Sequence, residues 1–249
     1  MRYYYFGLKF IFLLSFLFIS TFSFSQVKDA VLLDKVLKEL KLDESEIHME
    51  LVADKILPFS VDKTFFVIPK YRTKEKDEYG FYFYEFDVYV IIADNKNGKI
   101  LNKFYEPNAW TSDAINLNNI SIDTGLYNLN KKTRAVGVRV NYTGSSRPNP
   151  YNQTDLSLFI TENDKLKWVL KNFTVSEFHG EWDTNCSGKY EEVNSNIDIG
   201  KTMNNGFYNL IIKSKIKKTQ NIPTNNDCVE KIKTHQRVKN LKFNGIEYH

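Results

Sequence analysis

Alternation of apolar and polar residues with a period of two is the feature that most constrains the fold of this chain. Residues 80–94 show it most clearly, since every second position from Tyr82 to Ile92 is aromatic or aliphatic. Successive side chains of a β-strand point to opposite faces, so this pattern predicts a long strand with one buried face. Residues 134–142 repeat the pattern, and residues 155–161 are their expected partner.

Short turn sequences rich in Asn, Asp and Gly separate the apolar segments, at residues 94–98, 162–164, 204–206 and 244–245. They are typical of hairpin connections, because Gly and Asn tolerate the backbone conformations that tight turns require. Further strands are expected at residues 99–105, 166–173, 207–212 and 238–243. We therefore predict a mainly β fold, an antiparallel meander in the form of a sandwich, a barrel or a small propeller-like arrangement.

One helix is expected before the strands. Residues 27–42 place apolar side chains at helical spacing, with Lys and acidic residues between them. The apolar positions are Val27, Ala30, Val31, Val36, Leu37 and Leu40. Because charges of both signs are mixed along this segment, we expect an amphipathic helix that packs on the sheet rather than one that binds a membrane.

The segment before this helix has the pattern of a secretory signal peptide over residues 1–25. Arg2 and Lys9 precede the apolar run 10–19, and small serines surround the expected cleavage point. A membrane anchor is the alternative, but a spanning helix needs about 20 apolar residues and this run is shorter. We expect cleavage, no membrane span afterwards, and a soluble product in the periplasm or outside the cell.

Residues 26–249 would then form a single β-rich domain. Cleavage removes Arg2 and Lys9 and so halves the formal net charge of +4. A nearly neutral chain does not indicate a nucleic-acid partner, since such binding depends on clustered Lys and Arg that neutralise phosphates.

The chain has two cysteines, Cys186 and Cys228. Export would place both in a compartment that permits disulfides, so we expect them to be paired. The alternative, a reactive thiol with a His partner, requires an unpaired thiolate.

The most polar long connection, residues 143–154, lies between two predicted strands. It contains Arg147, Tyr151 and several amides, which are groups that recognise carboxylates, sugars or protein surfaces. Its length exceeds that of an ordinary hairpin loop. We therefore interpret Arg147 and Tyr151 as candidate binding residues, with an ordered structural loop as the alternative.

Two further predicted loops carry tryptophan, at residues 106–113 and 179–186. Trp110 and Trp182 could form an aromatic floor, with charge supplied by Glu181 and Asp183. Such a surface would suit an envelope protein or a glycan. The alternative is that each Trp packs in the core or against its own loop. For Glu181 and Asp183 the alternative is that they are simply solvated.

Glu181 and Asp183 also permit a second reading, as the acid and base of a glycan hydrolase. That activity requires two carboxyl groups on either side of a sugar cleft, about 5–10 Å apart. The chain contains no H-E-x-x-H motif, no glycine-rich phosphate loop and no G-x-S-x-G element. We expect no metal and no cofactor.

Residues 110–114, 142–151 and 180–186 together resemble a family of uncharacterised exported β-rich proteins of Gram-negative bacteria. Residues 205–212 and 241–248 are similar in rhythm to the periplasmic inhibitors of animal lysozymes. Residues 187–190 are one residue shorter than the S-G-x-x-Y loop of some of those inhibitors. The resemblance implies an extracytoplasmic compartment and no particular activity.

These observations favour an exported, non-enzymatic binding protein of the cell envelope. Its recognition residues would be Arg147, Tyr151, Trp110, Trp182, Glu181 and Asp183. A glycan hydrolase and a lysozyme-inhibitor-like protein are the alternatives.

Overall fold

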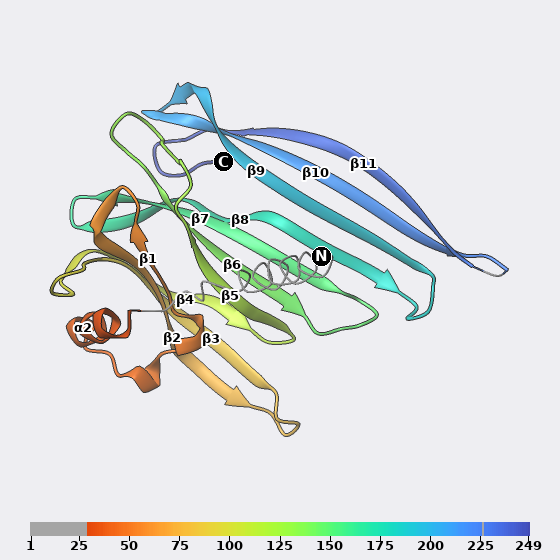
Figure 1. The fold of residues 1–249 in the computed structure, drawn as a ribbon, viewed down its shortest axis with the longest axis horizontal. Coiled ribbons are helices and arrows are strands. Elements are labelled where there is room, and N and C mark those ends of the chain that lie inside the picture. Colours follow the sequence, from red (N-terminus) through yellow and green to blue (C-terminus); the bar gives the residue numbers. More distant parts are fainter. Residues whose placement is uncertain (1–28, 226) are drawn as a thin grey trace, which may run out of the picture.

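The structure is a computed structural model that describes residues 29–225 and 227–249. The predicted signal peptide, residues 1–25, lies outside the described residues. Within the described part, one α-helix precedes a single connected sheet of eleven strands (Figure 1). The predicted mainly β, antiparallel fold class is confirmed.

Several strands, among them β4, β8 and β10, are longer than the sequence pattern predicted, because pairing continues through polar stretches that no apolar alternation marks. Their bounds are β1 Ala53–Leu57, β2 Ser60–Lys76, β3 Tyr82–Asp94, β4 Ile100–Ser112, β5 Ile115–Asp123, β6 Val136–Gly144, β7 Tyr151–Glu162, β8 Lys165–Trp182, β9 Gly188–Asn204, β10 Phe207–Pro223 and β11 Cys228–Leu241.

Eight of the strands form a sheet that curls into a nearly closed barrel, in the order β1-β2-β3-β4-β8-β7-β6-β5. Neighbours are antiparallel except for a single parallel contact between β4 and β8. After β4, which lies in the middle of this order, the chain enters β5, the edge strand at the end opposite β1. That placement brings β5 to β1, where Lys55 Nζ donates to the carbonyl oxygen of Ile122 at 3.2 Å.

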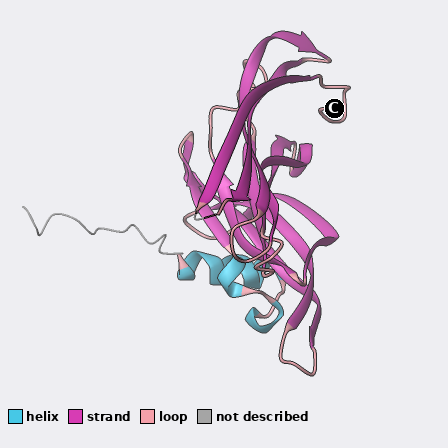
Figure 2. Ribbon diagram, turned by 90° about the vertical axis from the view of Figure 1, so that its right-hand side faces the viewer, coloured by secondary structure: helices cyan, strands magenta, loops and turns pink. Residues whose placement is uncertain are grey.

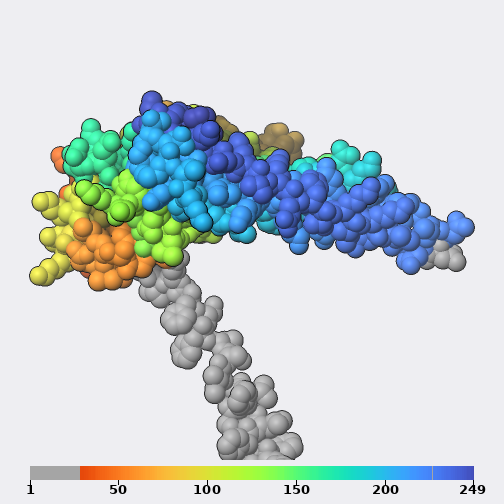
Figure 3. All heavy atoms as spheres, turned by 90° about the horizontal axis from the view of Figure 1, so that it is seen from above, coloured from red at the N-terminus to blue at the C-terminus, as the bar shows by residue number. Residues whose placement is uncertain are grey.

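Strand β8 belongs to two parts of the molecule. Its first residue, Lys165, pairs with β4, whereas residues 176–182 pair with β9. Strands β9, β10 and β11 continue from there as an antiparallel ribbon that extends away from the barrel (Figures 1 and 3). We call this ribbon, with residues 176–182, the arm, and the rest of the described chain the body.

The helix α2 (Ala30–Leu40) lies on one outer face of the body, beside the 3-10 turns η2 (Glu44–Glu46) and η3 (Met49–Leu51) (Figure 2). Asp29 caps it by accepting a hydrogen bond from the backbone of Leu32. The prediction that it packs on the sheet is confirmed. Its buried residues are Leu32, Leu33, Val36 and Leu37, so the predicted apolar face was partly wrong, and Val31 is 68% exposed.

Three buried clusters hold the body together. The first fills the inside of the barrel and contains Phe65, Phe86 and Val138. The second lies between α2 and the outer face of β2 and β3, where Phe66 is fully buried. The third joins the outer face of β7 and β8 to the near end of the arm, with Leu158 packed among residues of β10 and β11.

The third cluster defines two faces of the arm. Leu210, Ile212 and Leu241 turn toward the body. Because side chains alternate along a strand and the pairing between 210 and 220 is regular, the odd-numbered residues of β9 and β11 and the even-numbered residues of β10 share that side. We call it the inner face and the opposite side the outer face.

A disulfide between Cys186 and Cys228 closes the far end of the arm, with the two Cα atoms 5.8 Å apart. The predicted pairing is confirmed. The bond joins the turn after β8 to the start of β11, and therefore ties the outer strand of the arm to the strands nearer the body.

A buried carboxylate shapes β4. Opposite Asp87, three residues of β4 bulge out of register, and Asn108 has a φ of 49°. Asp87 accepts hydrogen bonds from the backbone N–H of Asn108 at 2.8 Å, from Arg72 Nε at 2.8 Å and from the hydroxyl of Tyr105 at 2.7 Å. Burial alone would raise the pKa of Asp87, but these hydrogen bonds and the Arg72 charge hold it below its usual value. The same contact raises the pKa of Tyr105 to about 12.

Candidate functional site

The far half of the arm and the connection between β6 and β7 meet at one end of the molecule. Residues 145–150 lie beside the end of β8, where the N–H of Trp182 donates to the carbonyl of Pro148 at 2.8 Å and that of Gly180 donates to Pro150 at 3.2 Å. The predicted loop 143–154 is in fact shorter, because β6 continues to Gly144 and β7 begins at Tyr151. The two hydrogen bonds from β8 fix the remaining connection, residues 145–150, against the arm. They also place the Arg147 guanidinium 5.4 Å from the ring of Trp182, a cation–π contact.

Arg147, Glu181, Trp182 and Asp183 are therefore neighbours. Glu181 is exposed on the inner face, and Trp182, one residue later in β8, is half-buried on the outer face. Segment 179–186 is not the loop that the sequence predicted, because β8 continues to Trp182. The turn begins only at Asp183, whose carboxylate accepts a hydrogen bond from the backbone of Asn185 at 2.9 Å.

Tyr151 starts β7 and lies directly opposite His179 of β8. Its hydroxyl donates to the side-chain oxygen of Gln153, and the amide of Gln153 in turn donates to Asp155 at 2.8 Å. Burial raises the pKa of Tyr151, so this phenol stays protonated as a donor. The phenol is thus tied into a polar row along β7, beside the other residues of the site.

Trp110 lies apart from these residues. Its indole is 9% exposed and packs inside the barrel with Phe86 and Leu117. The predicted loop 106–113 is in fact the second half of β4, which continues to Ser112. Trp110 pairs with Phe86 of β3 and therefore shares the face of that residue, inside the barrel.

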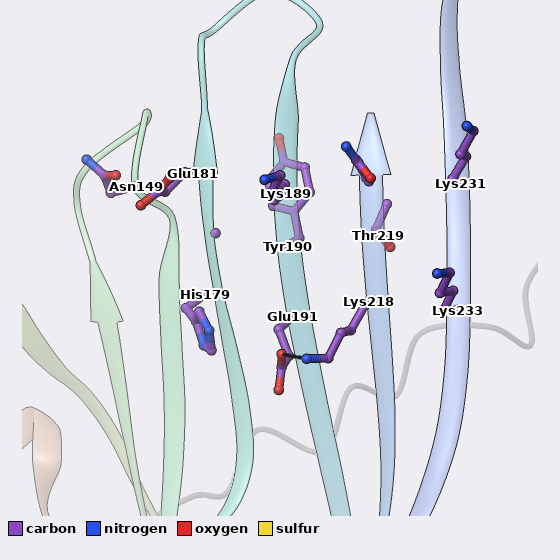
Figure 4. Close-up of a pocket in the computed structure, with 12 residues that line it drawn as sticks. Asn149, His179, Glu181, Lys189, Tyr190, Glu191, Lys218, Thr219, Lys231 and Lys233 are labelled. Atoms are coloured by element: carbon purple, nitrogen blue, oxygen red, sulfur yellow. Dashed lines mark ion pairs between the residues drawn. The ribbon is translucent and has the colours of Figure 1, made fainter. Parts of the chain in front are cut away.

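The meeting of the loop and the arm leaves an open hollow with a volume of about 790 Å³ (Figure 4). Its lining combines acidic, basic and neutral polar groups from the loop and from all four strands of the arm. They include Asn149, His179, Glu181, Lys189, Glu191, Lys218, Lys231 and Lys233. Lys218 Nζ and Glu191 form an ion pair at 2.8 Å, and the hydrogen bond from Lys218 lowers the pKa of Glu191.

A second, smaller hollow of about 360 Å³ adjoins the first and shares Asn149, Glu181 and Lys189 with it. Trp182 and Asp183 line this second hollow. Together the two hollows connect three of the predicted recognition residues, Glu181, Trp182 and Asp183, with lysines of the arm.

Sequence reasoning missed the arm lysines and His179. Lys218, Lys231 and Lys233 belong to stretches of β10 and β11 that were not predicted as strands. A signal was present, since residues 231–239 carry a cationic or His side chain at every second position. That period is typical of one face of a strand.

This end of the molecule presents several kinds of polar side chain. It offers ammonium groups, a guanidinium, carboxylates, amides and an imidazole on an open surface. Among residues 29–225 and 227–249, no group of three or more His, Cys, Asp or Glu side chains is arranged to hold a metal ion. No helix in the same part of the chain is long and apolar enough to cross a membrane.

No protein-family model matches the chain, and no curated protein matches it either. Among solved structures, it is similar to the extracellular domains 1-2 of Drosophila Semaphorin 1b, with 10% sequence identity and a TM-score of 0.23. The match covers 74% of this chain and 56% of that one, so it spans little more than half the length of the semaphorin structure.

Proposed function

We propose that this chain is an exported, non-enzymatic binding protein that recognises an envelope protein or glycan through the hollow between the arm and residues 145–150. One observation carries the proposal. Three recognition groups chosen from the sequence lie at two adjoining hollows: Glu181 lines the hollow of about 790 Å³, and Trp182 and Asp183 line the one of about 360 Å³. Arg147 contacts Trp182 beside them. Open polar hollows with an aromatic anchor and a guanidinium are typical of recognition surfaces.

Two observations support export. Residues 1–25 have the pattern of a cleaved signal peptide. The bond between Cys186 and Cys228 is of the kind that persists in oxidising compartments. A periplasmic or extracellular location follows as part of the proposal.

Binding is favoured over glycan hydrolysis by the surroundings of Asp183. Its carboxylate is engaged by the backbone of the β8–β9 turn, and its own N–H donates to Ser187 at 2.9 Å. A carboxylate that holds a turn is poorly placed to exchange a proton with a substrate.

The test compares wild type with Arg147→Ala/Trp182→Ala on an array of bacterial envelope glycans and on purified envelope proteins, with an animal lysozyme included. We expect the double variant to bind the wild-type partner at least about tenfold more weakly, as for a Trp and Arg hot spot. Lys76→Ala/Tyr82→Ala is the matched control, because it removes a second cation–π pair, at 5.2 Å, far along the chain in the β2–β3 hairpin.

Equal partner binding by wild type and Arg147→Ala/Trp182→Ala would contradict the proposal, as would a wild-type protein that binds nothing on the array. Release of reducing sugar ends from any glycan by the wild type, and its loss in Glu181→Gln, would instead support the hydrolase.

A further inference from the structure

The outermost strand of the arm carries a strip of positive charge on one face. Lys231, Lys233, Arg237 and Lys239 alternate along β11 with His235 between them. All have odd numbers and therefore lie on the inner face, the face that carries Leu241 at its near end. Lys231 and Lys233 also line the large hollow (Figure 4), so the strip begins inside the proposed site and runs along the arm toward the body.

The strip has a regular repeat. Alternate residues of a strand are roughly 7 Å apart, so the side chains from 231 to 239 present charge over about 27 Å. Every residue of the strip is exposed. Among the described residues, none of its four Lys and Arg side chains forms an ion pair with a carboxylate.

The arm concentrates charge that the whole chain does not show. Strands β10 and β11 contain eight Lys and Arg residues and a single acid, Glu230. The formal net charge of the full chain is only +4, because acidic residues elsewhere compensate. Like charges at this spacing repel one another, and an anionic ligand would relieve that repulsion.

Protection of a sheet edge against aggregation is the simpler reason for lysines on an edge strand. That role does not require the lysines to lie on one face of the strand. The outer face of β11 is equally exposed but carries no cation, only Ile232, Thr234, Gln236, Val238 and their neighbours Glu230 and Asn240. The segregation of all four cations to the inner face indicates a ligand on that side.

We propose that the inner-face strip of β11, with Lys218 and Lys189 beside it, binds an extended anionic polysaccharide. The proposal rests on the proposed function, since it identifies the class of partner that would enter the hollow. A repeating row of point charges suits a polymer with repeating sulfate, phosphate or carboxylate groups. Lysine outnumbers arginine in the strip, as fits ligands that require charge without bidentate or stacking geometry.

A glycan is favoured over single-stranded nucleic acid by the position of the aromatic side chains. Proteins that bind single strands stack the bases on aromatic rings beside a basic groove. The arm has a stacked ring pair, Phe178 and Tyr190, with centroids 6.0 Å apart. Strand pairing places both residues on the outer face, although Tyr190 also borders the hollow. Within the described residues, β11 and the inner face of β10 from 210 to 220 contain no Phe, Tyr or Trp.

The experiment measures binding of the full chain without residues 1–25 to dextran sulfate, with neutral dextran as the uncharged probe, over a range of salt concentrations. The test variant is Lys231→Gln/Lys233→Gln/Lys239→Gln. The matched control is Lys213→Gln/Lys215→Gln/Lys217→Gln, which removes the same charge from the outer face of the adjacent strand. Circular dichroism and thermal unfolding establish that both variants are folded.

We expect the inner-face variant to bind dextran sulfate at least about tenfold more weakly and to lose roughly two units of the salt-dependence slope. The outer-face variant should change affinity by less than about threefold. His235→Lys, which adds a charge within the strip, should strengthen binding.

Equal losses in the two triple variants would overturn the proposal, because they would show diffuse attraction rather than a strip. Failure of the wild type to bind dextran sulfate, or tighter binding of single-stranded DNA of matched charge, would also overturn it. The two proposals fail separately. If Arg147→Ala/Trp182→Ala abolishes partner binding while the inner-face triple does not, only the polysaccharide assignment is wrong.

Discussion

Adjacent residues of one strand differ in burial between the body and the arm. Phe65 and Phe66 follow one another in β2 and both are fully buried, one inside the barrel and the other under α2. Lys233 and Thr234 follow one another in β11 and both are exposed. At Phe65 and Phe66 β2 is covered on both faces, whereas β11 at Lys233 and Thr234 is covered on neither. We therefore expect the body to contribute most of the stability, and the arm to tolerate polar side chains on both faces.

The arm compensates for its missing core by other means. Its strands are long and regularly paired, and the Cys186–Cys228 bond closes its far end. Only its near end, through Leu210, Ile212 and Leu241, shares a cluster with the body. This difference predicts a gradient in the effects of substitutions.

The largest effect is expected inside the barrel. Phe86→Ala removes a fully buried ring from the first cluster and should lower the free energy of unfolding by about 3–5 kcal/mol, through lost burial and the cavity left behind. Urea denaturation measures this change. Ile232→Ala on the arm is the control and should change stability by no more than about 0.5 kcal/mol. Similar losses of unfolding free energy in both variants would contradict the inference that the body contributes most of the stability.

Loss of the disulfide should affect the arm selectively. Cys186→Ser/Cys228→Ser is expected to lower the free energy of local opening of the arm by about 2–4 kcal/mol, because it frees the end of a long loop. Hydrogen exchange followed by mass spectrometry should show faster exchange in β9, β10 and β11 and little change in β2 and β3. Faster exchange throughout the body would show that arm and body unfold as one unit.

The buried carboxylate of β3 gives a pH dependence to the body. Because the folded pKa of Asp87 lies below its ordinary value of 3.8, the ionised group stabilises the fold above that pH, and this contribution is lost as the pH falls. Asp87→Asn should cost about 1–3 kcal/mol at neutral pH. The difference in stability between wild type and variant, measured by thermal unfolding, should become smaller below about pH 4. A difference in stability that increased on acidification would contradict the hydrogen bonds assigned to Asp87.

The smallest effects are expected on the strip. Each of Lys231→Gln, Lys233→Gln and Lys239→Gln should change the free energy of unfolding by no more than about 0.5 kcal/mol, since every one of these side chains is exposed. Urea denaturation measures the change. A loss of several kcal/mol in any of them would show that the strip supports the arm structurally.

Much of the fold was predictable from local pattern. The alternation in residues 80–94 and 134–142 corresponds to β3 and β6, and the turn predicted at 204–206 separates β9 from β10. These features depend only on side-chain periodicity and on residues that tolerate tight turns. Polar strands were missed, above all β11, because a strand exposed on both faces needs no apolar alternation.

The site was predictable only in part. Arg147 and Trp182 are close together as expected, but Trp110 lies in the core, because β4 continues through the predicted loop and pairs Trp110 with Phe86 inside the barrel. Local sequence does not specify this pairing, since it depends on another strand.

By itself, the sequence determined the mainly β class, several strand and turn positions, and a cysteine pair available for bonding. The tertiary structure alone decided which charges from different strands share a surface. Net charge sums over the chain, whereas the field that a ligand meets depends on register, and pairing of β11 with β10 places the four cations of β11 on the inner face, beside Lys218. A nearly neutral chain thus presents a basic strip, because strand geometry and strand pairing, rather than composition, set the distances between charges.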